Sequence, residues 1–171
     1  AITVSEYEEI HPEGPLLNSV FSLEHGYNNL WVTFGAYSIF FAPTLERSGI
    51  SRLYNSEWNN ISYDSIQNTI QSNVYDLNYI SINPLDPNQL FISSFHSGLL
   101  SVKVEDSIEL LNATNSELEP LIYLPNPNYV SIRVSGSSFD NDANLWVLNS
   151  KVKKPLKKFN PSNNQWTSYD F

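Results

Sequence analysis

The chain has 171 residues, of which 41% are hydrophobic and 13% aromatic, and this composition excludes a disordered protein. Its net charge of −9 at pH 7 excludes a nucleic-acid backbone as partner, because few cations are available to neutralise phosphates, and it disfavours docking on an anionic surface. Cysteine is absent, which excludes disulfides, thiolate zinc sites and cysteine nucleophiles. No run approaches the roughly 18 apolar residues of a membrane-spanning helix, so no membrane span is predicted.

The N-terminal segment, residues 1–19, is acidic and rich in proline. We expect Ile2-Thr-Val4 to be a strand left from a preceding structural unit and the remainder to be a loop. The chain begins at Ala1, contains no methionine and shows no basic-then-apolar leader, so we expect it to be a mature or excised piece.

A first meander of four short strands is predicted over residues 20–63. Val20–Leu23 is followed by polar turn residues and then by Leu30–Phe34. After a loop that contains proline, Ile50–Leu53 pairs with Trp58–Ile61 across a short polar turn. Apolar runs separated by Asn, Gly, Ser and Pro in this way are typical of antiparallel hairpins.

A second meander of the same kind is predicted over residues 79–111. Its strands are Tyr79–Ile82, Leu90–Ser93, Gly98–Val104 and Ile108–Leu111. The first turn is rich in Asn, Asp and Pro and the last contains two acidic residues, as expected of exposed hairpin tips.

A third meander is predicted over residues 129–171. Val130–Val134 precedes an Asn- and Asp-rich turn, and the strand Leu145–Val147 follows that turn. Pro155–Phe159 and the run that ends at Trp166 complete the unit, and both end in aromatic side chains. Such a sheet has an apolar face that it cannot cover itself, so another sheet must stack on it.

Two polar segments, residues 64–78 and 112–128, are predicted to be linkers between these meanders. Apolar residues recur every four positions within residues 65–74, which is a helical spacing. The β-branched residues and asparagines there make a poor helix, so we expect irregular structure instead.

The strongest signal in the chain is an internal repeat. The tetrapeptides that begin at Asn29, Gln89 and Asn144 align, and they place a leucine and then an aromatic residue at equivalent positions. The distances along the chain between these tetrapeptides exceed the roughly 40–50 residues of a typical propeller repeat. The two polar linkers account for the additional residues. The predicted fold class is therefore all-β: a partial β-propeller of about three four-stranded antiparallel blades.

The turn of the third meander resembles a known kind of propeller repeat. Phe139 and the pattern Asp140-x-Asp142-x-Asn144-Leu-Trp-Val are similar to the two-component-regulator type of β-propeller repeat. Ala143 stands where that repeat prefers glycine, so we expect a less tight turn.

From about Val20 to Phe171 the chain also resembles a narrower group, the PorZ-like propeller proteins of the bacterial type IX secretion system. The order of the motifs over this length carries the resemblance. They are Leu30–Gly35, Gly49–Leu53 with Trp58, Asn83-Pro84 with Asp86-Pro-Asn88, Ser97–Leu100, Asn115–Leu118, and Asn144–Val147 with Pro155–Lys157.

This resemblance implies a non-catalytic propeller protein of the periplasm or the outer-membrane surface, without a cofactor. It implies an accessory role in the complex that processes secreted cargo and joins it to anionic lipopolysaccharide, so the expected partners are secretion-system proteins or a glycan. Two alternatives stay open: the extracytoplasmic sensor propeller of a hybrid two-component receptor, and a propeller polysaccharide lyase or glycosidase. We also expect the three blades to self-associate through their uncovered end faces.

Asp140, Asp142 and Asn144 occupy alternate positions, like the first ligands of a calcium loop. That loop requires glycine where Leu145 stands and a bidentate glutamate where Lys151 stands. We therefore expect a hairpin turn capped by side chains rather than a metal site.

Aromatic residues at two kinds of position are candidates for different roles. Trp31, Phe91 and Trp146 alternate with leucine or isoleucine in strands, so we expect core packing rather than carbohydrate stacking. Tyr27, Phe34 and Tyr37 lie near loops and are the candidate exposed aromatics of a binding site.

Residues 151–158 contain five of the nine lysines and arginines of the chain. Lys153, Lys154 and Lys157 are the candidates for contact with an anionic group. The simpler interpretation is a solvated strand edge that the lysines protect from pairing with another sheet.

Overall fold

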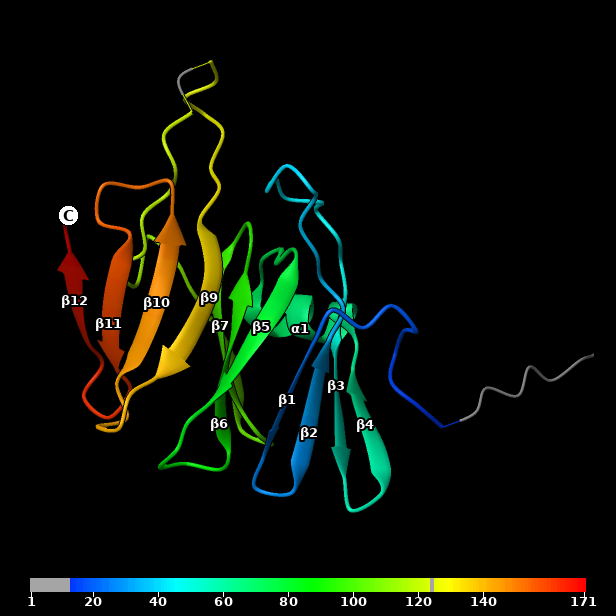
Figure 1. Ribbon diagram of the computed structural model, residues 1–171. Helices are drawn as coiled ribbons and strands as arrows, with labels where there is room; N and C mark the ends of the chain where they lie inside the picture. The colour runs from blue at the N-terminus through cyan, green and yellow to red at the C-terminus, as the bar shows by residue number, and fades with distance from the viewer. Residues whose placement is uncertain (1–12, 124) are drawn as a thin grey trace, which may run out of the picture.

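The computed structural model describes residues 13–123 and 125–171, which form twelve strands and one α-helix. The strand expected at Ile2–Val4 lies outside these residues. The strands form three separate four-stranded antiparallel sheets. Figure 1 shows that the sheets fan out from a shared centre, so the prediction of three antiparallel propeller blades is confirmed.

The first sheet is formed by β1 (Ser22–Gly26), β2 (Asn29–Thr33), β3 (Ile50–Tyr54) and β4 (Glu57–Ile61), paired in this order. The β1–β2 turn is tighter than the polar run suggested. Gly26 pairs with Asn29, so only Tyr27 and Asn28 form the turn. Both have positive φ, 51° and 60°, as a two-residue type I′ hairpin turn requires.

The second and third sheets repeat this order outward from the centre. The second contains β5 (Leu77–Ile82), β6 (Gln89–Ser94), β7 (Gly98–Lys103) and β8 (Ser107–Leu111), and the third contains β9 (Arg133–Phe139), β10 (Leu145–Ser150), β11 (Leu156–Asn160) and β12 (Gln165–Tyr169). The first strand of each sheet, β1, β5 or β9, lies at the centre of the fan (Figure 1).

Residues 64–78 were predicted to be an irregular linker, and over part of this range that prediction is wrong. Helix α1 spans Tyr63–Ile70 and packs beside β8. Ser62 caps it, since its hydroxyl accepts a hydrogen bond from the backbone N–H of Ser65 (3.2 Å). Ile66 is fully buried in the core, so tertiary packing and the cap override the weak intrinsic propensity.

Two hydrophobic cores fill the spaces between consecutive sheets. Trp31 of the first sheet and Leu90 of the second meet in one core. Phe91 of the second sheet and Leu145 of the third meet in the other. The repeated leucine therefore faces the preceding sheet, and the aromatic residue after it faces the following one.

The described part of the chain contains no helix that is long and apolar enough to cross a membrane, since α1 has eight residues.

Candidate functional site

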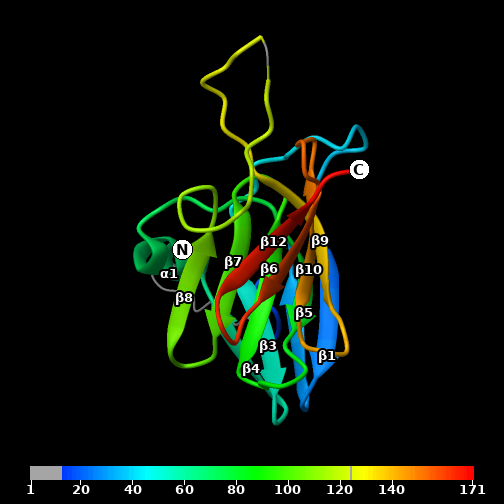
Figure 2. The same cartoon turned by 90° about the vertical axis from the view of Figure 1, so that its left-hand side faces the viewer.

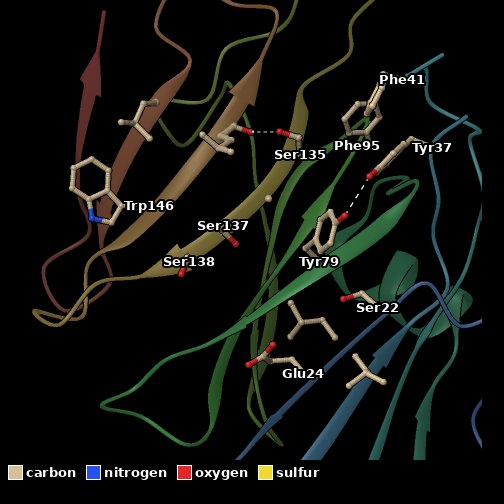
Figure 3. A pocket seen from close by; sticks show the side chains of 15 residues that line it. Ser22, Glu24, Tyr37, Phe41, Tyr79, Phe95, Ser135, Ser137, Ser138 and Trp146 are labelled. Atoms are coloured by element: carbon tan, nitrogen blue, oxygen red, sulfur yellow. Dashed lines mark hydrogen bonds between the residues drawn. The ribbon is translucent and has the colours of Figure 1, made fainter. Parts of the chain in front are cut away.

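The candidate site is a groove of about 850 Å³ along the innermost strands of the three sheets. Strand β1 contributes Ser22 and Glu24, β5 contributes Tyr79, and β9 contributes a run of serines. In Figure 3 the serines of β9 lie between Trp146 on one side and a cluster of aromatic rings on the other. The groove therefore occupies the position where a complete propeller has its central channel.

An aromatic cluster forms one wall of the groove. Tyr37 stacks on Phe41 with ring centroids 5.5 Å apart and packs against Phe95 at 5.0 Å. Its hydroxyl lies 3.2 Å from the hydroxyl of Tyr79, and this hydrogen bond, together with burial, raises the pKa of Tyr37 above its usual value. The Tyr37 phenol therefore stays protonated at neutral pH, and both hydroxyl groups can form hydrogen bonds with a ligand.

Serines of β9 form the opposite wall, and the hydroxyls of Ser137 and Ser135 are also hydrogen-bonded to the hydroxyls of Ser81 (2.9 Å) and Ser150 (3.0 Å). Ser135, Ser137 and Ser138 line the groove, with Gly136 between the first two. The hydroxyl of Ser81 donates to the backbone oxygen of Ser137 (2.8 Å), which ties β5 to β9 at this point. Aromatic faces opposite a small set of hydroxyl groups are the usual chemistry of a site for a neutral, hydroxyl-rich ligand.

The loop that carries Tyr37 and Phe41 is anchored by a buried carboxylate. Asp76 is fully buried and accepts hydrogen bonds from the backbone N–H groups of Thr44 and Leu45 (both 3.1 Å) and of Glu46 (2.9 Å). These charge-assisted bonds fix the returning arm of the loop, so the aromatic wall is held in place before a ligand arrives.

Arg133, which belongs to β9, holds the other arm of the same loop in place. Its guanidinium donates to the backbone oxygen of Phe41 (3.1 Å) and lies over the ring of Phe95 at 5.7 Å. The loop of the first sheet, the β6–β7 turn and the third sheet therefore meet at one point, which joins all three blades.

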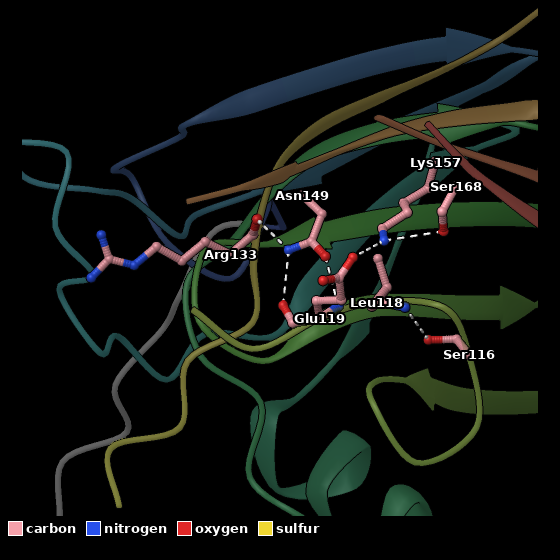
Figure 4. A network of polar contacts seen from close by, with 7 residues as sticks. All are labelled: Ser116, Leu118, Glu119, Arg133, Asn149, Lys157 and Ser168. Atoms are coloured by element: carbon pink, nitrogen blue, oxygen red, sulfur yellow. Dashed lines mark hydrogen bonds and ion pairs between the residues drawn. The ribbon is translucent and has the colours of Figure 1, made fainter. Parts of the chain in front are cut away.

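The lysine prediction is wrong for Lys157. It is fully buried, and its ammonium donates to a carboxylate oxygen of Glu119 and to the hydroxyl of Ser168 (3.1 Å), as Figure 4 shows. Strand β11 lies between β10 and β12, so it is not a strand edge either. Lys157 therefore stabilises the segment that contains Glu119, whereas Lys153 and Lys154 are exposed on the β10–β11 loop.

Asn149 completes this network on the backbone side. Its side-chain oxygen accepts from the backbone N–H of Glu119 (2.7 Å), and its amide donates to the backbone oxygens of Glu119 (3.1 Å) and Arg133 (3.4 Å). The segment after β8 is thereby held against β10 and β11 (Figure 4). The network is structural, because its polar groups are already paired with one another.

The side chain of Asp140 caps the β9–β10 turn. It accepts from the backbone N–H groups of Asp142 (3.0 Å) and Asn144 (2.9 Å) and from the indole N–H of Trp146 (2.8 Å). These bonds, the one from Trp146 above all, lower the pKa of Asp140 to about 2. Ala143 adopts φ 58°, the left-handed conformation that glycine adopts most easily, so the turn keeps its form without glycine.

The other predicted site residues are scattered. Tyr37 lines the groove, whereas Tyr27 lies at the tip of the β1–β2 hairpin and its hydroxyl donates to the backbone oxygen of Pro84. The prediction that Phe34 is exposed is wrong, since it is 2% exposed and belongs to the core. Trp146 is half-buried and lines the groove, so neither core of the described residues contains it.

Sequence reasoning missed Phe41, Tyr79 and Phe95, which complete the aromatic wall. Tyr79 starts the predicted first strand of its meander, and in a propeller that strand lines the channel. This position was the available signal for Tyr79. Nothing local marked Phe95, which follows a buried strand.

Three four-stranded sheets around a groove lined by their first strands define a segment of a β-propeller. One solved structure with this fold is PorZ, an essential surface component of the type IX secretion system of Porphyromonas gingivalis. The TM-score is 0.80 at 20% sequence identity, and the match covers 97% of this chain and 21% of PorZ. The likeness in fold to PorZ that the motifs predicted is confirmed.

Two other solved structures share the fold at greater distance. The extracellular domain of a hybrid two-component system from B. thetaiotaomicron matches with TM-score 0.58 and 15% identity, over 91% of this chain and 19% of that one. A catalytically inactive virginiamycin B lyase from Staphylococcus aureus, solved with quinupristin, matches with TM-score 0.57 and 12% identity, over 89% of this chain and 41% of that one. No family model and no curated protein sequence matches the chain. Since a sensor and an enzyme share this fold, the fold alone does not assign a function.

Proposed function

We propose that the chain is a non-catalytic recognition segment of a cell-surface propeller protein that serves type IX secretion. The observation that carries the proposal is the groove, in which an aromatic wall faces a row of serine hydroxyls. The likeness to PorZ over nearly the whole chain supports the choice of system, and it exceeds the likeness to the sensor domain.

The ligand that this groove fits is a saccharide, such as a sugar unit of lipopolysaccharide. Sugars present apolar faces that stack on aromatic rings and hydroxyl groups that bond to serines and phenols. Among the described residues that line the groove, Glu24 is the single carboxylate. Glycoside hydrolysis generally requires a pair of carboxylates across the scissile bond, so the groove supports binding rather than turnover.

The proposed location is the periplasm or the outer-membrane surface, in agreement with the surface and extracellular proteins that share the fold. This chain spans about a fifth of the length of PorZ. We therefore propose that further blades cover its two end sheets in the intact protein and that the isolated chain self-associates there. Sedimentation of a stable monomer that binds no apolar dye would contradict the self-association.

Titration of the full chain with cell-surface polysaccharides and their oligosaccharides tests the groove. Tryptophan fluorescence and calorimetry would report binding, since Trp146, one of the four tryptophans, lines the groove. We expect Tyr37→Ala and Tyr79→Ala each to weaken binding by about tenfold, because each removes a stacking face and a hydroxyl group.

The matched control is Tyr54→Ala, which removes an exposed tyrosine from the end of β3, outside the groove. This variant should bind as the wild type does. Absence of saccharide binding would overturn the recognition role, and release of cleaved product would overturn the non-catalytic one. Cross-linking in the source cells tests the assignment to type IX secretion. Recovery of secretion-system components would support this assignment. A kinase domain on the same polypeptide would instead support the role of an extracytoplasmic sensor.

A further inference from the structure

The two ends of the molecule differ in construction. The six hairpin turns that join the first to the second strand and the third to the fourth strand of each sheet lie at one end, which we call the hairpin end. The longer connections, which include residues 34–49, 112–132 and 151–155, lie at the other, which we call the loop end. Both views show segment 36–45 and the described residues of segment 120–131, which are 120–123 and 125–131, projecting beyond the sheets at the loop end (Figures 1 and 2).

The most exposed large apolar side chains of these connections lie on the two projecting segments. In segment 36–45, Ile39 is 87% and Phe40 83% exposed, and in segment 120–131 Ile122 is 84% exposed. Phe41, Tyr123 and Val130 add further exposed apolar surface on the same two segments. Isolated exposed apolar residues are ordinary, whereas a concentration on two protrusions marks an interaction surface.

Segment 36–45 is built to enter an apolar layer. It contains no charged residue, and the same is true of segment 120–131. At its tip the backbone N–H of Ser38 donates to the oxygen of Ala42 and that of Phe41 donates to the oxygen of Ser38 (both 2.9 Å). The hydroxyl of Ser38 accepts from the N–H groups of Phe40 (3.3 Å) and Ala42 (3.2 Å). These bonds satisfy four backbone N–H groups of the tip, which lowers the cost of placing the tip at a lipid–water interface.

The charges of the chain are distributed in a complementary way. The hairpin turns carry acidic residues, which are Asp86, Glu105, Asp106, Asp140 and Asp142. The β10–β11 loop at the loop end carries Lys151, Lys153 and Lys154, which are all exposed. The other connections of the loop end also carry Glu46, Glu117 and Arg47, as well as Glu119, which is paired with Lys157. The loop end is therefore mixed in charge, and the lysines of the β10–β11 loop form the positive patch through which it can approach an anionic surface.

We propose that the loop end docks on a lipid surface, with Ile39, Phe40 and Ile122 inserted among the acyl chains and the β10–β11 lysines at the headgroups. This depth and composition are those of interfacial anchors. Segment 120–131 projects farther than segment 36–45 (Figure 1). The sheets must therefore tilt relative to the lipid surface for both tips to reach it. Ile39, Phe40 and Ile122 do not line the saccharide groove, although segment 36–45 also carries Tyr37 and Phe41 of its aromatic wall. The proposal stands whether or not the groove binds sugar.

A protein partner is the competing occupant. Protein interfaces rich in aromatic residues usually include arginine and a polar rim around a central patch. The two tips instead are separate and uncharged, which fits insertion into a fluid layer better than docking into one fixed surface. A protein that binds these tips while vesicles do not would overturn the lipid assignment.

Co-sedimentation of the full chain with vesicles free of glycolipid tests the proposal, since such vesicles offer no saccharide to the groove. Phosphatidylcholine vesicles, with and without phosphatidylglycerol, should both bind the wild type. We expect Phe40→Ser and Ile122→Ser each to lower the partition coefficient about tenfold, because each removes one inserted side chain. Neutralising Lys151, Lys153 and Lys154 with glutamine should lower binding to the anionic vesicles alone, by about fivefold per lysine.

Two controls separate the tips from other exposed apolar surface. Leu85→Ser removes a side chain that is 78% exposed at the hairpin end, and Tyr54→Ser removes one that is 39% exposed at the end of β3. Both variants should bind vesicles as the wild type does. The proposal would be overturned if the wild type bound neither kind of vesicle, or if the controls lost as much binding as the tip variants. The role of the lysines would be overturned if the glutamine variant kept the preference for anionic vesicles.

Discussion

The middle sheet and the third sheet contain the same four-strand unit, yet they differ in burial. Strand β6 of the middle sheet is buried at all six residues, whereas β10 alternates between buried and more exposed positions. Phe91 of β6 is 1% exposed because the third sheet covers it, and the equivalent Trp146 is half-buried because no described sheet lies beyond it. The difference shows that the neighbouring sheet, and not the local sequence, sets the burial of the aromatic residue.

The repeated leucines show the same effect in the opposite direction. Leu90 and Leu145 are buried against a preceding sheet, whereas Leu30 of the first sheet is half-buried with no described sheet before it. The two end sheets therefore present faces that have the pattern of a blade interface. A blade of the same repeat would complete both faces, since its leucine would meet Trp146 and its aromatic residue would meet Leu30.

The largest expected effect comes from Phe91→Ala in the middle sheet. This side chain packs against Phe139 and Phe159 at ring distances of 5.9 and 5.8 Å, so its removal leaves a cavity between two sheets. We expect a loss of about 3–5 kcal/mol in the free energy of unfolding, measured by urea denaturation. Trp146→Ala at the equivalent position should cost about 1–2 kcal/mol, because it removes a half-exposed ring and one hydrogen bond. Equal losses would contradict the role that we give to the neighbouring sheet.

A second comparison concerns Leu100 in the middle sheet and Lys157 in the third. Leu100 pairs with Ile92 and Lys157 pairs with Val147, so the two residues are equivalent, and both are fully buried. Lys157→Leu should change the free energy of unfolding by less than about 1 kcal/mol, because a leucine already suits this position and the ion pair repays little beyond its desolvation. Glu119→Ala should cost about 2–3 kcal/mol, since it leaves the buried ammonium without its counter-charge.

Chemical denaturation of the two variants and of their double mutant measures this difference. The double mutant should recover most of the stability that Glu119→Ala loses, since no buried charge remains. A double mutant as unstable as Glu119→Ala would mean that Glu119 acts through its packing and not through Lys157.

The pH dependence of stability tests the role of the Asp140 carboxylate in the capped turn of the third sheet. The pKa of Asp140 is lowered from 3.8 to about 2 in the folded chain, so its ionised form stabilises the fold above pH 3.8, and this contribution disappears as the pH falls through 2. We expect Asp140→Asn to lower the melting temperature at pH 6 and the gap from wild type to close toward pH 2. Asp142→Asn is the control, because Asp142 contributes its backbone N–H to the turn. A gap that stays constant with pH would contradict the role of the carboxylate.

The sequence predicts the repeated strands because their period and turn residues are local. It did not predict α1, since the helix depends on a cap at Ser62 and on burial of Ile66 by other elements. It also placed Lys157 at a solvated edge, because the partner Glu119 lies 38 positions away and only the third dimension brings them together.

Only part of the groove could be predicted from the sequence. Tyr37 was identified as a candidate because it lies in a loop next to a strand. Tyr79 and Phe95 join it only through the packing of the first sheet on the second, which no local pattern encodes. Phe34 was misplaced for a related reason, since the loop after it is bound to the next sheet through the N–H of Gly35 and the oxygen of Leu77 (2.8 Å).

The smallest expected effect concerns the single residue at which the third turn departs from the repeat. Ala143 has φ 58° and is 7% exposed, so glycine would relieve backbone strain but remove a buried methyl group. We expect Ala143→Gly to raise the free energy of unfolding by about 0.5 kcal/mol, measured by thermal and urea denaturation. Asn164→Gly is the matched control, because Asn164 has the same φ of 58° in the β11–β12 turn and asparagine tolerates it, so stability should stay within about 0.3 kcal/mol. Equal gains in both variants would show that backbone strain at Ala143 is no greater than at asparagine, and the departure from the repeat would then carry no energetic cost.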